Sequence, residues 1–143
     1  MRDYRKIIAW QKADDLTVAV YVESKSMPRE ELYGLTSQIR RAAYSVPANI
    51  AEGASRSSKK DYLHFLYIAR GSLAELSYFI HLCHRLDYIN EDMRSTLDAQ
   101  YDECSRTLTG LIKSVEREAG PIRRTIAKVS AGPIMALPVF LYK

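Results

Sequence analysis

Apolar residues recur at alternating spacings of three and four over most of residues 1–119, a pattern typical of helices that bury one face. The most regular stretch predicts a helix over 58–86. Ser58 followed three residues later by Asp61 is a typical N-terminal cap for this helix. Its inward stripe is expected to contain Tyr62, Phe65, Leu66, Ala69, Ser72, Leu73, Leu76, Phe79, Ile80, Cys83 and Leu86.

Three further helices are predicted around it. The first covers roughly 5–25 and ends before Pro28, which lacks a backbone donor. The second begins near 29 or 35 and ends near 54, and the fourth runs from about 91 to 118, between the cap Asn90 and the stop at Gly120. The inward face of the first helix is expected to contain Trp10, Ala13, Leu16, Thr17, Val20 and Tyr21.

Short links join these segments, so the sequence predicts an all-α, antiparallel up-down-up-down four-helix bundle over 1–119. Pro47 lies inside the second helix and leaves the carbonyl of Ala43 without its usual donor, so we expect a kink there. Residues 120–143 form an irregular C-terminal tail. Its apolar stretch 133–142 is interrupted by proline, and we expect it to dock on the bundle or on a neighbouring subunit.

Few residues point to catalysis or to a cofactor. His81 and His84 lie about one turn apart, but no second cluster supplies further ligands, so no metal is expected. The sequence has no glycine loop for phosphate and no convincing acid–base pair, so we expect neither enzymatic activity nor a small-molecule substrate. The polar start, the lack of an 18-residue apolar run and two cysteines in apolar stretches favour a cytoplasmic protein with no membrane association.

Charge is distributed unevenly along the chain. Residues 1–119 contain 17 basic and 17 acidic side chains, so the net charge of +4 comes from the tail. Basic residues gather between 40 and 60, whereas 87–118 is acidic. The basic stretch could bind nucleic-acid phosphates, contact the acidic helix of another subunit, or form a solvated turn. It comprises Arg40, Arg41, Arg56, Lys59 and Lys60.

The ten tyrosines are numerous for this length, and several lie off the inward stripes. Aromatic side chains at such positions favour protein interfaces, so we expect a homo-oligomer. Our first hypothesis is a non-catalytic oligomeric scaffold that contacts RNA, DNA or a nucleic-acid enzyme through the five basic residues. The alternative is a protein-only assembly module with no nucleic-acid role.

Four stretches of the sequence together resemble one known family. They are Trp10-Gln-Lys-Ala13, Tyr33-Gly-Leu-Thr-Ser-Gln-Ile-Arg-Arg-Ala-Ala43, Val46-Pro-Ala-Asn-Ile-Ala-Glu-Gly53 and Phe65-Leu-Tyr-Ile-Ala-Arg-Gly-Ser-Leu-Ala-Glu-Leu76. Over about residues 4–118 the chain resembles the four-helix-bundle family of 23S rRNA intervening-sequence proteins, which includes the accessory variability determinant of diversity-generating retroelements. The resemblance implies a bacterial, cytosolic, non-enzymatic protein, commonly a ring-shaped homopentamer. For the retroelement relative it implies binding to a reverse transcriptase and to nucleic acid.

The family motif also carries over residue by residue, with structural roles that we infer from physical chemistry. Asn49 and Glu52 are expected to recruit the groups left free at Pro47. One of Arg40 and Arg41 is expected to pair with Glu52 or Glu75 while the other points outward. Gly53 is expected to end the second helix, and Gly71 to let another helix approach closely. After Gly120 the sequence departs from the family pattern.

Overall fold

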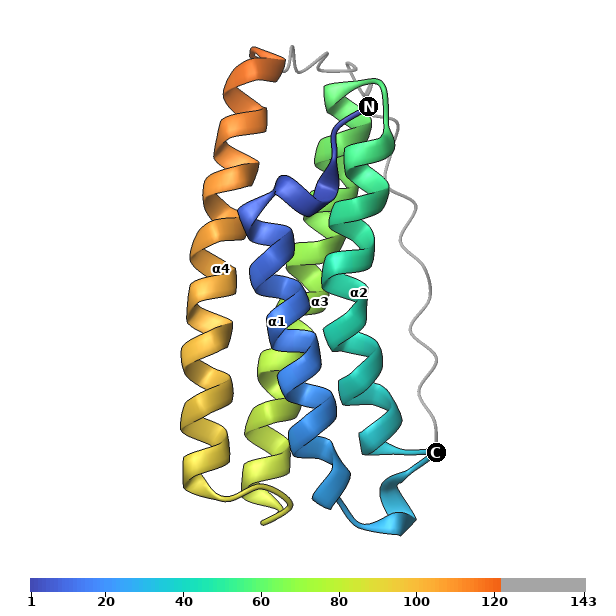
Figure 1. The fold of residues 1–143 in the computed structure, drawn as a ribbon, viewed down its shortest axis with the longest axis vertical. Helices are drawn as coiled ribbons and strands as arrows, with labels where there is room; N and C mark the ends of the chain where they lie inside the picture. The colour runs from blue at the N-terminus through green and yellow to red at the C-terminus, as the bar shows by residue number, and fades with distance from the viewer. Residues whose placement is uncertain (122–143) are drawn as a thin grey trace, which may run out of the picture.

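The computed structural model describes residues 1–121, which form four long helices and three short 3-10 turns and contain no strand (Figure 1). This confirms the predicted all-helical four-helix bundle. The long helices are α1 (Ile8–Glu23), α2 (Leu35–Ser55), α3 (Lys59–Arg85) and α4 (Glu91–Ala119). The 3-10 turns are η1 (Tyr4–Lys6), η2 (Ser24–Ser26) and η3 (Arg29–Glu31).

Each helix packs against the next one along the chain, and α4 packs against α1. In Figure 1 the chain descends along α1, ascends along α2, descends along α3 and ascends along α4. The helices α1 and α3 therefore lie diagonally across the bundle and run in the same direction. The predicted docking of the tail concerns residues that lie outside the described part of the chain.

Side-chain caps start the two longest helices. The Oγ of Ser58 accepts a hydrogen bond from the Asp61 amide at 3.1 Å, and Oδ1 of Asn90 accepts one from the Met93 amide at 2.9 Å. The helix α4 ends at Gly120, whose φ of 73° favours glycine. The predicted helix start near 5 was wrong, because this segment forms the 3-10 turn η1. Of the two starts predicted for the second helix, the one near 35 is confirmed, whereas residues 29–31 form the turn η3.

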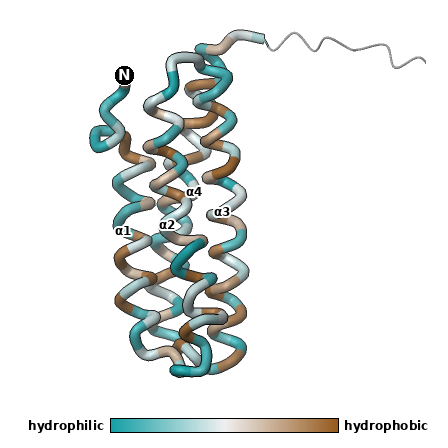
Figure 2. Tube along the Cα trace, turned by 90° about the vertical axis from the view of Figure 1, so that its right-hand side faces the viewer, coloured by the Kyte–Doolittle hydropathy of each residue, from teal (hydrophilic) through white to brown (hydrophobic). Residues whose placement is uncertain are grey.

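The core is a continuous layer of apolar side chains between the four helices, and Figure 2 shows hydrophobic and hydrophilic segments alternating along each of them. Tyr21 and Leu86, which were predicted to point inward, are instead 40% and 45% exposed. Leu86 lies just beyond the last residue of α3. The largest fully buried side chains are Tyr62, Leu16, Ile50, Leu66, Leu76, Ile80, Leu97, Leu108, Val20, Val46, Cys83 and Cys104.

Both cysteines are free and belong to this core. Burial raises the pKa of Cys83 to about 11 and that of Cys104 to about 12. Both thiols therefore stay protonated at neutral pH and are poor nucleophiles. Within residues 1–121, no helix has the length and apolar character needed to cross a membrane.

A side chain from α1 compensates for the proline inside α2. Pro47 has no N–H to donate to the carbonyl of Ala43. The Thr17 hydroxyl lies 3.0 Å from that carbonyl oxygen and 2.8 Å from the carbonyl oxygen of Ala13, so it can donate to either. The donor was predicted to come from Asn49 or Glu52, and this was wrong. The helix α2 is assigned without a break from Leu35 to Ser55, and the kink at Pro47 stays a prediction.

Gly53 sets the close approach of α2 and α3 near their connecting turn. A Cβ at this position would lie 2.9 Å from Cβ of Phe65 and 2.9 Å from Cδ2 of Tyr62. The Phe65 Cβ atom is fixed to the backbone, so it cannot move aside cheaply. The helix continues two residues past Gly53, so its predicted role as the end of the helix was wrong.

We expect Thr17→Val to lower the free energy of unfolding by about 1–3 kcal/mol, because it leaves the buried Ala43 carbonyl without a donor. Urea denaturation at fixed protein concentration measures this loss. Thr17→Ser keeps the hydroxyl and should cost less. In a Pro47→Ala background, the new alanine supplies the missing N–H, and the cost of Thr17→Val should shrink. An equal cost in both backgrounds would contradict the assigned role of Thr17.

We expect Gly53→Ala to lower the free energy of unfolding by about 1–3 kcal/mol, because the added methyl group overpacks the contact with α3. Gly110→Ala in α4 is the matched control. A Cβ at Gly110 would meet nothing within 4 Å, so alanine should raise stability there by up to about 1 kcal/mol. Thermal unfolding of the two variants should therefore shift in opposite directions, and a stabilised Gly53→Ala would show that the contact is not tight.

Candidate nucleic-acid interface

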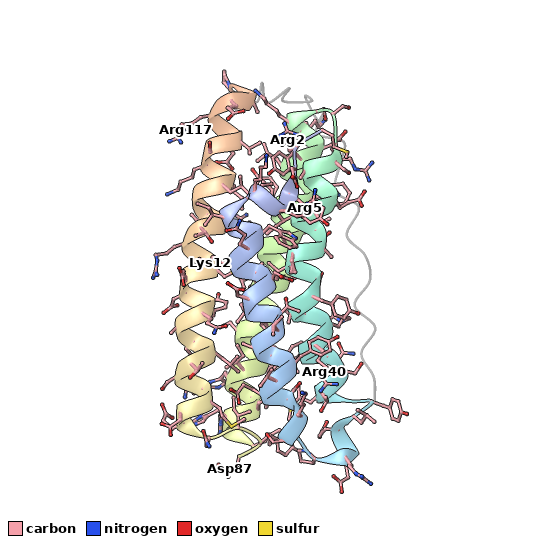
Figure 3. All side chains as sticks on the ribbon, in the orientation of Figure 1. Arg2, Arg5, Lys12, Arg40, Asp87 and Arg117 are labelled. Carbon is pink, nitrogen blue, oxygen red and sulfur yellow. The ribbon has the colours of Figure 1, made fainter. Side chains whose placement is uncertain are left out.

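Three segments of the chain meet at one end of the bundle, which we call the basic end. They are residues 1–6, the turn between α2 and α3 with its flanks (52–61), and the last turns of α4 (113–120). Together these segments contain eight Lys or Arg side chains and five carboxylates. Figure 3 shows Arg2 and Arg117 at this end and Arg40 near the opposite end.

The basic end has an acidic counterpart at the other end of the bundle. Residues 23–34 and 84–95 contain four Lys or Arg side chains and six Asp or Glu side chains. The two ends of the bundle therefore carry net charges of opposite sign. The tail with its four basic residues and no acidic ones continues from the basic end at Gly120.

Arg56 is the centre of the contacts at the α2–α3 turn. Its Nη2 donates to Oε1 of Glu52 at 2.6 Å, and its guanidinium lies 4.7 Å from the centre of the Phe65 ring. The backbone carbonyl of Arg56 accepts a hydrogen bond from Nη1 of Arg2 at 3.1 Å. The guanidinium of Arg2 also lies over the Tyr62 ring, at 4.5 Å, so the N-terminal segment is attached to this end of the bundle.

Lys59 connects the start of α3 to the end of α4. Its Nζ lies 3.3 Å from Oε2 of Glu118 and donates to the backbone carbonyl of the same residue at 3.2 Å. That carbonyl is one of the groups that an α-helix leaves without a partner at its C-terminus. Lys60 makes no ion pair within residues 1–121, and the same holds for Lys6, Lys113 and Arg117. These four cations are available to an external anion.

Lys59 and Lys60 also border a groove of ≈ 640 Å³ between α3 and α4. Its walls combine apolar surface with cations. Such walls suit a nucleotide, whose base is apolar on its faces and whose phosphate is anionic, and they suit a peptide as well. The hydroxyl of Tyr67 donates to Oε1 of Glu116 at 2.6 Å, and this bond raises the pKa of Tyr67. The residues that line the groove are Lys59, Lys60, Leu63, His64, Tyr67, Glu118 and Ala119.

Arg40 and Arg41 do not join the other three predicted cations. They precede Arg56 by 16 and 15 residues along α2, which corresponds to roughly 23 Å of helix. Arg40 donates from Nε to Oγ of Ser24 at 2.8 Å and stacks over the Tyr21 ring at 4.9 Å. Arg41 pairs with Glu75 of α3. The five predicted residues therefore form two separate groups, and only Arg56, Lys59 and Lys60 belong to the basic end.

The remaining motif residues have mainly structural contacts. The Nδ2 of Asn49 donates to the carbonyl oxygen of Ser45 at 2.7 Å, and the hydroxyls of Ser45 and Ser72 lie 2.9 Å apart. The bond of Asn49 lies within α2, whereas the contact between Ser45 and Ser72 and the pair of Arg41 and Glu75 join α2 to α3 along their shared face. Gly71 was predicted to admit another helix, but a Cβ there would meet nothing within 4 Å.

No metal centre emerges from the geometry of the described residues. Residues 1–121 contain no group of three or more His, Cys, Asp or Glu side chains that could hold a metal ion. His84 lies between charged neighbours, with Nε2 2.9 Å from Oε2 of Glu91 and Nδ1 3.1 Å from Nη1 of Arg94. Its two nitrogens are therefore engaged in a surface network.

The sequence analysis missed the contributions of Arg2, Lys113 and Arg117 to the basic end. Arg2 lies 54 residues before its partner Arg56, and the two α4 residues lie within a stretch whose overall composition is acidic. Their place could have been predicted from the alternating direction of the four helices. This alternation brings residues 1–6, the turn between α2 and α3, and the end of α4 to the same end of the bundle.

Comparison with known proteins agrees with this architecture. The family described as 23S rRNA-intervening sequence protein matches residues 5–110. A crystal structure of a protein of unknown function from the S23 ribosomal protein family of Bacteroides thetaiotaomicron is similar, with 25% sequence identity and a TM-score of 0.69. The alignment covers 74% of this chain and 99% of that one. No functionally curated protein matches the chain. Because the family match spans well over half of its length, the chain belongs to the 23S rRNA-intervening sequence protein family.

Proposed function

We propose that this protein is a non-catalytic scaffold that assembles with copies of itself and binds the phosphates of RNA or single-stranded DNA at the basic end. The observation that carries the proposal is the opposite net charge of the two ends of the bundle. Lys6, Lys60, Lys113 and Arg117 reach this end from three separate segments, and none of them is paired within the described residues. The mention of 23S rRNA in the family's description agrees with an RNA partner.

The ion pairs at this end do not prevent binding. Exposed salt bridges contribute only about 0–1 kcal/mol, so a phosphate can compete with the carboxylate of Glu52 or Glu118 for its cation. Both pairs are half exposed, with Glu52 and Glu118 side chains 50% and 57% exposed. Such contacts position a backbone without reading bases, so we expect little sequence preference.

The alternative is a protein-only assembly module. One observation favours it, namely that Arg41, Arg56 and Lys59 each already pair with a carboxylate of the same chain. In that case the cations stabilise the bundle and its contacts with partner proteins, for which a reverse transcriptase is one candidate implied by the family resemblance.

We expect a triple substitution of Lys60, Lys113 and Arg117 by Gln to lower affinity for a labelled RNA hairpin and for labelled oligothymidylate at least tenfold near 0.1 M salt. The dependence of log K on log salt should flatten by about two to three, because each lost phosphate contact removes roughly 0.7–0.9 from the slope. Fluorescence anisotropy at several salt concentrations measures both quantities. None of the three side chains supports the fold through an ion pair within residues 1–121.

The matched control changes Lys25, Arg29 and Arg85 to Gln at the opposite end. It removes the same charge from exposed positions that form no ion pair within residues 1–121. This variant should keep the wild-type slope. Equal losses in both variants would show that only net charge matters, and a wild-type protein that binds neither probe at 0.05 M salt would favour the protein-only module.

A further inference from the structure

Arg40 alone, of the three arginines predicted to bind nucleic acid, has no carboxylate partner in the described part of the chain. Arg41 pairs with Glu75 and Arg56 pairs with Glu52, whereas no ion pair of the described residues contains Arg40. Its side chain is half-buried on α2, near the end of the bundle that carries net negative charge (Figure 3). The basic end does not use this cation, so another role has to account for its position.

Two contacts with α1 and the turn that follows it hold the guanidinium of Arg40 in one orientation. Its Nε donates to Oγ of Ser24 at 2.8 Å, and its central carbon lies 4.9 Å from the centre of the Tyr21 ring. Ser24 is only 4% exposed, and its hydroxyl donates to the carbonyl of Tyr21 at 3.2 Å, so the acceptor is fixed as well. The two Nη groups, by contrast, have no hydrogen-bond partner within residues 1–121. The guanidinium is therefore held in place while most of its donors stay unused.

Tyrosine rings border this guanidinium on both helices. Tyr21 stacks against it from α1, and Tyr44 follows Arg40 by four residues on α2, so the two side chains lie one turn apart on the same side of the helix. Tyr44 is 48% exposed. Tyr and Arg side chains often supply most of the binding energy of a protein interface, because their large flat groups exclude water from the contact. We call Tyr21, Ser24, Arg40 and Tyr44 the Arg40 cradle.

The free donors of the cradle fit a single carboxylate. The Nη1 and Nη2 groups of an arginine can donate two parallel hydrogen bonds to the two oxygens of a carboxylate, and lysine cannot reproduce this geometry. Because the chain already fixes the guanidinium, binding immobilises little additional side-chain freedom. The cradle is therefore prepared for an acidic side chain that approaches from outside.

The surroundings of Arg40 do not suit a nucleic acid. Affinity for a nucleic-acid backbone comes from several phosphate contacts together. The nearest end of the bundle has net negative charge, which repels a polyanion. None of the residues three or four positions from Arg40 on α2 is charged, and these residues are Thr36, Ser37, Ala43 and Tyr44. An isolated cation between tyrosine rings suits one acidic side chain of a protein better than a row of phosphates.

We propose that the Arg40 cradle binds an Asp or Glu side chain of a partner protein. The carboxylate accepts from both Nη groups of Arg40, and apolar side chains next to it in the partner pack against Tyr21 and Tyr44. The contact lies on the α1–α2 pair, away from the basic end. Neither nucleic-acid binding nor self-assembly is needed for it.

A tripeptide with one carboxylate is the simplest probe of the cradle. We expect N-acetyl-Leu-Glu-Leu-amide to shift the Nε–H signal of Arg40 in NMR spectra and to saturate with a Kd of roughly 1–10 mM, as one fork-shaped ion pair with apolar contacts allows. The matched peptide with Gln in place of Glu should cause no saturable shift. A Glu peptide that does not saturate by about 20 mM would overturn the carboxylate site. An equal or larger shift with inorganic phosphate at the same ionic strength would favour a nucleic acid and overturn the choice of a protein partner.

Two lysine variants separate the geometry of the guanidinium from its charge. Arg40→Lys keeps the charge but loses the paired donors, so it should weaken binding of the Glu peptide at least about fivefold, as followed through backbone amide signals. Arg41→Lys is the matched control, because Arg41 is already paired with Glu75, and it should keep the wild-type affinity. Circular dichroism verifies that both variants stay helical. Equal affinities of the two variants would overturn the role of Arg40.

Hydrogen exchange in the free protein tests the fixed orientation without any ligand. The Nε–H of Arg40 should exchange with water at least about tenfold more slowly than that of the exposed Arg117, because its bond to the buried Ser24 must open first. Equal exchange rates would overturn the prepared geometry of the cradle.

Light scattering distinguishes a foreign partner from another copy of this chain. Arg40→Lys should keep the wild-type mass at every protein concentration, because the cradle is not used for self-assembly. A lower mass for this variant would show that the carboxylate belongs to a second copy and would overturn the assignment to a partner protein. The RNA titrations test the basic end separately, so failure at one site leaves the result at the other intact.

Discussion

The close approach of α2 and α3 at Gly53 controls the end of the bundle on which the proposed activity depends. Because Gly53 has no side chain, Tyr62 and Phe65 pack directly against the backbone of α2. These two rings then support the guanidinium groups of Arg2 and Arg56. A larger residue at this position would separate the helices and displace both cations. The tight helix contact and the arrangement of charge at the basic end are therefore one feature of the fold.

The helices and most of their boundaries could be predicted from sequence, because a buried face repeats with the helical period and caps such as Ser58 and Asn90 are local signals. The partners of individual residues could not. Thr17 looked like a core position, and nothing near it in the sequence indicates that it compensates for Pro47 in another helix. The roles of Gly53 and Gly71 were misassigned for a related reason, since a glycine in a helix does not reveal which neighbour it faces.

Sequence proximity was also a poor guide to the charged surface. Arg40 and Arg41 are close to Arg56 in the sequence, yet a continuous helix separates them and turns them toward other partners. Lys113 and Arg117 are distant in the sequence but close in space, because successive helices reverse direction. The net charge of a sequence segment was therefore a poorer guide to the charged surface than the summed charge of all segments that meet at one end of the bundle.

The bond between Thr17 and the carbonyl of Ala43 has a consequence for how the chain acquires its structure. Donor and acceptor are 26 residues apart and belong to the first two long helices. Both groups are therefore synthesised before α3 and α4, and the α1–α2 hairpin itself contains the donor that its proline defect requires. The pairing of α1 with α4 spans the largest sequence separation in the bundle and can form only after synthesis of the last helix.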